Sequence, residues 1–219
     1  MEGLKQKYKG IVFDFDYTLG DSAEGIVQSV RYALERIGYG NCSGGAIRRT
    51  IGLSLKNTYI ALTGDTDEDS AEAFARYFKE KADEVMVDCT ELYPSVKELL
   101  ASFREQGFRT AIVTTKFHYR IEAILKKFQA EALIDLIIGG DDVKIEKPDP
   151  EGLLEVIKTL GLSAGEVLYV GDSLVDAATA KNAGVDFAGV LTGTTTREEL
   201  ERYPHRMMME SVKELGGQI

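Results

Sequence analysis

Short apolar runs alternate along this chain with segments patterned as amphipathic helices, and this alternation limits the possible fold more than any other feature. The runs are rich in β-branched residues, and they lie at residues 11–15, 110–114, 167–170 and 187–191, with a weaker candidate at 133–138. The helical patterns between them lie at residues 94–106, 119–128, 150–160 and 174–183. Strands that alternate with helices of this length predict a Rossmann-like α/β fold, a parallel sheet with helices on both faces.

The region between residues 22 and 87 interrupts the alternation. It has no candidate strand, and its helices are expected at about residues 22–38, 46–51, 55–62 and 70–87. The simplest interpretation is an all-helical cap that is inserted after the first strand. We therefore predict an α/β core domain formed by residues 1–20 and 90–219, and a helical cap domain formed by residues 21–89. A last short strand is expected near residues 207–209.

The composition excludes several classes of partner. The 26 Lys and Arg residues against 36 Asp and Glu give a formal charge of −10, which argues against nucleic acid or an anionic membrane as the main partner. No run of ~18 or more apolar residues occurs, and the first ten residues lack the apolar stretch of a signal peptide. Cys42 and Cys89 lie far apart and are expected to be reduced thiols, so the predicted compartment is the cytoplasm.

Carboxylates stand where two of the expected strands end. Asp14 and Asp16 follow the first strand at a spacing of two, so their side chains point the same way. Asp172 ends the run at 167–170, and Asp176 follows it by four residues. Taken singly, these aspartates could cap turns or a helix. Together, at the carboxyl edge of one sheet, they would repel each other strongly and would need a cation, for which an all-oxygen ligand set favours Mg²⁺.

Two further strand ends carry groups that suit phosphate. The run at 110–114 ends in Thr114, Thr115 and Lys116, where hydroxyls and backbone N–H groups can receive phosphate oxygens. The alternative there is a threonine helix cap followed by a solvated lysine. Lys147 stands before a proline that restricts its backbone, so this turn can aim an ammonium group at the site, although a surface lysine beside a proline is common.

These four strand ends, taken in order, read D-x-D-x-T, a threonine, a lysine in K-P-x-P, and G-D-S-x-x-D. The combination resembles the haloacid dehalogenase superfamily of phosphotransferases over roughly residues 9–193. It is most similar to the branch with a helical cap after the first strand, which includes phosphoglycolate phosphatases, β-phosphoglucomutases and small pyrophosphatases.

The resemblance implies a reaction and a role for each acid. Asp14 would be the nucleophile that forms an aspartyl-phosphate, and Asp16 would be the general acid and base. Asp16 also separates phosphate-ester chemistry from dehalogenation, because family dehalogenases lack this second aspartate. Mg²⁺ would be held by Asp14, Asp16 and Asp172, with Asp176 binding it directly or supporting the ligands.

The resemblance also implies a set of substrate contacts. These are expected from Thr18, Thr114, Thr115 and Lys147, with Arg49 of the cap as a possible partner for an anionic substrate group. Thr114 and Lys147 would also be catalytic. The implied substrate is a small phosphorylated metabolite, with phosphoglycolate as the leading guess, and the protein is expected to be a monomer or weak homodimer. Tyr17 departs from the family, since many relatives have glycine there.

Three classes of function remain open at this stage: a hydrolase, an isomerase and a non-catalytic binding protein. The preferred one is a phosphatase of small phosphomonoesters. The alternatives within the family are a β-phosphoglucomutase-like sugar phosphate mutase and an inorganic pyrophosphatase. A non-catalytic binding protein on the same fold is the third class, but such relatives would be expected to lose Asp14, Asp16 or Lys147, and this chain keeps all three.

Overall fold

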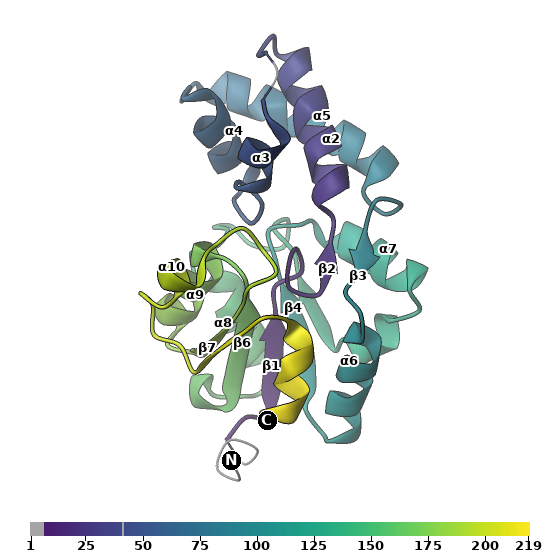
Figure 1. Ribbon diagram of the computed structural model, residues 1–219, viewed down its shortest axis with the longest axis vertical. Helices are drawn as coiled ribbons and strands as arrows, with labels where there is room; N and C mark the ends of the chain where they lie inside the picture. Colours follow the sequence, from purple (N-terminus) through teal and green to yellow (C-terminus); the bar gives the residue numbers. More distant parts are fainter. Residues whose placement is uncertain (1–6, 41) are drawn as a thin grey trace.

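Six parallel strands form the main sheet of the computed structural model, which describes residues 7–40 and 42–219 (Figure 1). The strands are β1 (Gly10–Phe13), β4 (Arg109–Val113), β5 (Leu136–Ile138), β6 (Val167–Gly171), β7 (Asp186–Val190) and β8 (Met207–Met209), in the order β5-β4-β1-β6-β7-β8. The expected strand at 133–138 begins late because Glu131–Leu133 forms a 3₁₀ turn. The short strand expected near 207–209 is present and pairs with β7.

Strand β1 lies at the centre of the sheet, hydrogen-bonded to β4 on one side and β6 on the other. The register places Phe13 level with Ile112 and with Val170. The residues that follow these three positions therefore meet at the carboxyl edge, where parallel α/β sheets bind ligands. Every residue of β1 is buried, which explains why its sequence is a continuous apolar run.

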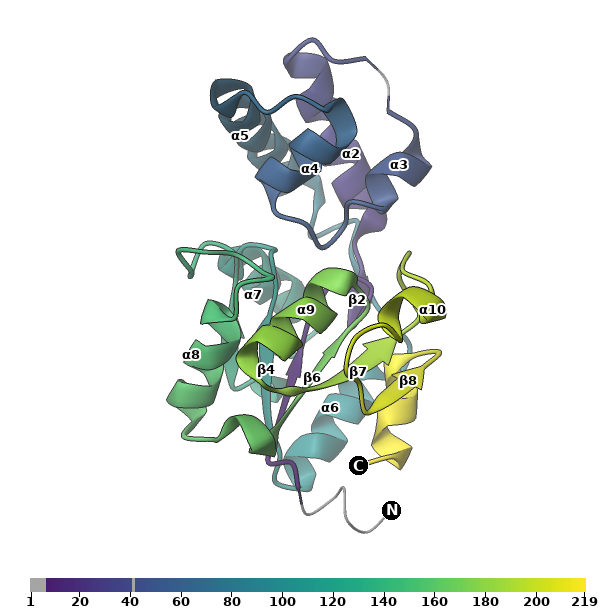
Figure 2. The same cartoon turned by 90° about the vertical axis from the view of Figure 1, so that its left-hand side faces the viewer.

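The two faces of the sheet are covered by different helices, as the two views show (Figures 1 and 2). Ile11 and Phe13 pack toward α6 and α7, while Val12 between them packs toward α8 and α9. The helices around the sheet are α6 (Val96–Glu105), α7 (His118–Lys127), α8 (Glu151–Leu160), α9 (Leu174–Ala183), α10 (Arg197–Leu200) and the 3₁₀ helix Val212–Gly217. The predicted α/β fold is confirmed.

The helical segment lies beyond the carboxyl edge of the sheet (Figure 2). It consists of α2 (Ala23–Arg36), α3 (Gly44–Arg48), α4 (Leu55–Thr63) and α5 (Glu68–Val85). Its apolar cluster draws only on residues between 26 and 86, and it includes Tyr59 and Phe74. Two short antiparallel strands connect it to the sheet, β2 (Gly20–Asp21) and β3 (Glu91–Leu92), which the sequence did not suggest. Within the described residues, no helix is long and apolar enough to cross a membrane.

Candidate active site

Asp14 stands at the centre of the carboxyl edge, one residue beyond β1. Its backbone N–H donates to the carbonyl of Val170 at 2.8 Å, which continues the pairing with β6 past the end of the strand. Its side chain is 2% exposed and accepts a hydrogen bond from the ammonium of Lys147 at 2.7 Å. This contact joins residues that are 133 positions apart in sequence.

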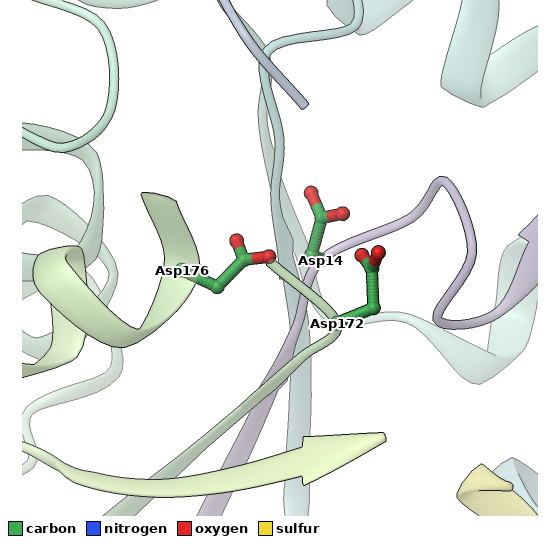
Figure 3. A group of neighbouring side chains, drawn as sticks. All are labelled: Asp14, Asp172 and Asp176. Carbon is green, nitrogen blue, oxygen red and sulfur yellow. The ribbon is translucent and has the colours of Figure 1, made fainter. Parts of the chain in front are cut away.

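Asp172 and Asp176 complete a buried carboxylate cluster with Asp14 (Figure 3). One oxygen from each of the three residues lies within 4.8 Å of the others. Burial raises the pKa of Asp14 to about 7, although Lys147 acts in the opposite direction. Burial, together with the charges of Asp176 and Asp14, raises the pKa of Asp172 well above its usual range. The three carboxylates therefore cannot all stay ionised with Lys147 as the cation between them.

Lys147 joins the two sides of the cluster. Besides its bond to Asp14, its ammonium donates to Asp176 at 2.6 Å and to the hydroxyl of Tyr169 at 3.1 Å. Burial acts to lower the pKa of Lys147, but the charges of Asp14 and Asp176 outweigh it and raise that pKa well above its usual value. The lysine is therefore a fixed cation, and it is 6% exposed.

Both carboxylate oxygens of Asp176 accept hydrogen bonds from protein groups. One of its oxygens accepts from Lys147 and Tyr169, and the other accepts from the backbone and hydroxyl of Ser173. Ser173 in turn caps α9 through the backbone N–H of Asp176. The capping role considered for Asp172 thus belongs to Ser173, which leaves the Asp172 carboxylate outside the capping bonds.

The residues present fit a small divalent cation. The donor set is all oxygen, and the carboxylates of Asp14 and Asp172 need a positive charge beyond Lys147 in order to stay ionised together. Gly193 lies directly against Asp172, since a Cβ at this glycine would overlap the carboxylate. The backbone of this loop therefore forms a cradle that fixes the Asp172 side chain.

Asp16 pairs with Lys116, to which the sequence pattern assigns no catalytic role and which it allows as a solvated lysine. The ammonium of Lys116 lies 3.1 Å from Asp16 Oδ2, and the two side chains are only 4% and 9% exposed. Among the described residues, Asp16 Oδ1 and Thr18 Oγ1 are buried oxygens without a hydrogen-bond partner. Buried polar groups are nearly always hydrogen-bonded, so these two oxygens indicate a place where a ligand atom can form a hydrogen bond.

The turn that holds Asp16 and Thr18 includes Tyr17 in the left-handed region, with a φ of 59°. This conformation is the reason that glycine suits this position so well. The hydroxyl of Thr192 donates to the carbonyl of Tyr17 and so ties the turn to the loop after β7. Burial raises the pKa of Tyr17, although the nearby Arg48 of the helical segment acts in the opposite direction.

The expected phosphate-binding residues are only partly gathered. Thr114 is 4% exposed and stands just beyond β4, where its hydroxyl accepts from the N–H of Lys116 at 3.3 Å. Thr115 lines a cavity together with Asp16. Arg49 is exposed at the end of α3 and does not join this group, whereas the neighbouring Arg48 reaches Tyr17.

A cavity of about 50 Å³ lies beside Asp16, between the sheet edge and the helical segment. The sheet side contributes Thr115 and Lys116, and the helical segment contributes residues of α2, α4 and α5. Arg120 of α7 also reaches this cavity, and it binds Asp83 of α5 at 2.7 Å. The helical segment therefore lines the side of this cavity that lies opposite the sheet edge.

A buried aspartate at the end of the central strand, held by a buried lysine within a carboxylate cluster, is the arrangement expected of a hydrolase that uses an aspartate as its nucleophile. The chain belongs to the haloacid dehalogenase-like hydrolase family, whose sequence model matches residues 11–190. Both the resemblance and the enzyme class predicted from the motifs are confirmed.

Individual relatives span nearly the whole chain. Pyrophosphatase PpaX of Bacillus velezensis is 30% identical over 210 residues, which cover 96% of this chain and 95% of the relative. The crystal structure of a haloacid dehalogenase-like hydrolase from Bacteroides fragilis is 44% identical, with a TM-score of 0.92, and covers 97% of this chain and 100% of that one. A predicted phosphoglycolate phosphatase from Haemophilus somnus is 25% identical, with a TM-score of 0.84, and covers 95% and 96%.

Proposed function

We propose that this enzyme is a Mg²⁺-dependent phosphatase that hydrolyses small phosphomonoester metabolites through an aspartyl-phosphate on Asp14. The observation that carries the proposal is the 2.7 Å contact between Asp14 and Lys147 inside the carboxylate cluster. A carboxylate fixed in this way has one oxygen held by the ammonium, and its other oxygen is available to attack phosphorus. Phosphoglycolate is the reference substrate, after the phosphatases that the chain resembles.

In the first half of the reaction, an oxygen of Asp14 forms a bond to phosphorus while the bond from phosphorus to the leaving oxygen breaks. Asp16 gives its proton to that leaving oxygen. In the second half, Asp16 takes a proton from water, and the water oxygen attacks the phosphorus of the aspartyl-phosphate. Inorganic phosphate then leaves, and Asp14 returns to its carboxylate form.

The metal site would be formed by Asp14, Asp172 and the backbone carbonyl of Asp16. A bound Mg²⁺ would supply the positive charge that the clustered carboxylates and the transferring phosphoryl group require. Asp176 would hold Lys147 in place, since both of its oxygens already accept hydrogen bonds from protein groups.

The other polar groups at the sheet edge would hold the phosphoryl oxygens. Lys147 would offset negative charge on the phosphoryl group. The hydroxyls of Thr18 and Thr114 and the backbone N–H of Thr115 would donate hydrogen bonds to its oxygens. The buried, unpartnered hydroxyl of Thr18 supports this assignment. Arg49 stays a proposal as a contact for an anionic substrate group.

We also propose the division into two domains, a core of residues 1–20 and 90–219 and a cap of residues 21–89. The separate apolar cluster of the helical segment and its two thin connections through β2 and β3 support it. The cap would close over the site and exclude water from the aspartyl-phosphate. The monomer or weak homodimer and the cytoplasmic location stay predictions from the sequence.

Pyrophosphate is the second candidate substrate, because PpaX of Bacillus velezensis is a pyrophosphatase by name. A sugar phosphate mutase would use the same core groups, but it would transfer the phosphoryl group from Asp14 back to a sugar. Interconversion of glucose 1- and 6-phosphates without net phosphate release would identify the mutase.

The test of the proposed function is phosphate release from a panel of phosphomonoesters, with pyrophosphate included. We expect phosphate release with Mg²⁺, and a rate at least about 100-fold lower in EDTA. EDTA removes a Lewis acid that would stabilise the charge of the transition state by several kcal/mol. Re-addition of Mg²⁺ should restore the rate, which separates metal removal from damage to the protein. A wild-type enzyme that releases no phosphate from any compound, or that is indifferent to EDTA, would contradict the proposal.

The cradle at Gly193 provides a sharper test of the metal site. Gly193→Ala should raise the Mg²⁺ concentration for half-maximal activity by about 10- to 100-fold, because the added methyl overlaps the Asp172 carboxylate and displaces it. Gly165→Ala is the matched control, since a Cβ there meets no atom within 4 Å. Equal Mg²⁺ titrations for the two variants would show that Asp172 does not hold the metal.

A further inference from the structure

Two buried lysines stand at the sheet edge, and they differ in how many of their hydrogen-bond donors are used. The ammonium of Lys147 donates to three protein groups. The ammonium of Lys116 has one polar contact among the described residues, with Asp16 at 3.1 Å, although its side chain is only 4% exposed. An ammonium can donate three hydrogen bonds. Lys116 therefore keeps donor capacity that the described part of the chain does not use.

The cavity beside Asp16 is where a ligand can reach these donors. Lys116 and Asp16 both line it, and the buried Oδ1 of Asp16 has no hydrogen-bond partner among the described residues. Arg120 is a second cation of this lining, but it donates to the carboxylate of Asp83 and to the carbonyl of Lys79. Lys116 is thus the cation with fewer protein partners, and a group bound in the cavity would lie beside it.

The proposed reaction brings the leaving group to this place. Asp16 would give its proton to the leaving oxygen, so that oxygen must come within hydrogen-bond distance of Asp16. The atoms bonded to the leaving oxygen then lie near Lys116, because the ammonium is 3.1 Å from Asp16 Oδ2. While Asp16 carries the proton, it no longer offsets the charge of Lys116. A buried cation in this position is costly unless the substrate supplies a negative charge.

We propose that Lys116 determines substrate specificity: it binds a negative charge on the leaving group and selects substrates that carry one close to the scissile oxygen. The carboxylate of phosphoglycolate and the second phosphate of pyrophosphate both meet this description. Apolar residues of the helical segment that line the same cavity, such as Leu53 and Phe78, would keep water from the ion pair and so strengthen it. This inference rests on the proposed phosphatase function and refines its substrate class.

The test compares phosphoglycolate with phosphoglycolamide, in which an uncharged amide of similar size replaces the carboxylate. We expect kcat/KM of the wild type to favour phosphoglycolate by at least about tenfold, the scale of a hydrogen bond between charged groups in a buried site. Lys116→Met removes the charge and should bring the ratio of the two kcat/KM values to within about twofold of one. The ratio does not depend on how much of a preparation is folded, so a loss of stability in this variant does not affect it.

Two further variants separate charge from other effects of the substitution. Lys116→Arg keeps the charge and should retain a preference for phosphoglycolate of at least about threefold. Lys97→Met is the matched control, because it makes the same change at an exposed position of α6 and should leave the wild-type ratio unchanged.

Pyrophosphate is the second anionic probe. Its kcat/KM relative to that of phosphoglycolamide should fall at least about tenfold in Lys116→Met, because its leaving group is also an anion. The larger of the two wild-type kcat/KM values, for phosphoglycolate or for pyrophosphate, identifies the anion that the cavity suits.

A wild type that does not discriminate between phosphoglycolate and its amide overturns the inference and leaves the phosphatase function standing. So does a Lys116→Met variant that keeps the wild-type ratio. No release from any ester or from pyrophosphate overturns the phosphatase function itself, and the inference with it.

Discussion

Asp14→Asn should reduce phosphate release by at least about 10⁴-fold, the scale expected when a hydrolase loses its nucleophile. The amide keeps the size and shape of the side chain, but its oxygen is a poor nucleophile toward phosphorus. The amide also lacks the negative charge that would help to hold Mg²⁺. Substrate binding should change less than turnover, because Lys147, Thr18 and Thr114 stay in place.

The same substitution should leave the fold intact or stabilise it. Burial raises the pKa of Asp14 to about 7, so near neutral pH the native state carries a carboxylate that its surroundings disfavour. An amide removes that charge, and Lys147 keeps its bonds to Asp176 and Tyr169. The melting temperature in EDTA is therefore expected to equal or exceed that of the wild type.

Turnover is measured as single-turnover phosphate release, and stability is measured as the melting temperature in EDTA. Both measurements use the same preparation of each variant. The control is Asp69→Asn, which makes the same chemical change at an exposed position of α5 and should alter neither quantity. Wild-type turnover in the Asp14→Asn variant would show that Asp14 is not the nucleophile. If the variant is inactive because it is largely unfolded, the Asp14 carboxylate stabilises the native state, and the expectation that its charge is unfavourable there is wrong.

The strand ends could be predicted from the sequence because their signal is local. A buried parallel strand is a short apolar run, and the first polar residue after it lies at the edge of the sheet. The structure has Asp14, Thr114 and Asp172 directly after strands β1, β4 and β6, where this pattern predicts them. The sequence does not predict the contact between Tyr169 and Lys147, because a tyrosine inside an apolar strand has the pattern of a core residue.

The groups that were missed depend on contacts between distant segments. Lys116 has the local pattern of a solvated lysine, and its burial results from the Asp16 turn and the helical segment above it. The choice between Arg48 and Arg49 depends on helix phase. Helix α3 begins at Gly44, two residues earlier than expected, and Arg48 is the arginine beside Tyr17. Helix boundaries are the least reliable part of a sequence-based prediction.

Lys147→Met should be both inactive and strongly destabilised, in contrast to Asp14→Asn. Removal of the ammonium leaves Asp14 and Asp176 buried at close range without their common cation. Breaking a buried ion pair from one side typically costs about 3–5 kcal/mol, because an uncompensated charge remains. For a chain of this length, that loss corresponds to a melting temperature lower by roughly 10 °C.

The double variant Asp14→Asn with Lys147→Met decides whether charge is the cause. If the destabilisation comes from unmatched carboxylates, removing the Asp14 charge should recover part of the lost stability, although activity stays absent. Lys158→Met is the control, because it breaks an exposed pair with Glu155 and should cost less than about 1 kcal/mol. The free energy of unfolding is measured by denaturant unfolding in EDTA. If the losses of the two single variants simply add in the double variant, Lys147 stabilises the fold by packing. Its three polar contacts would then contribute to the reaction and not to stability.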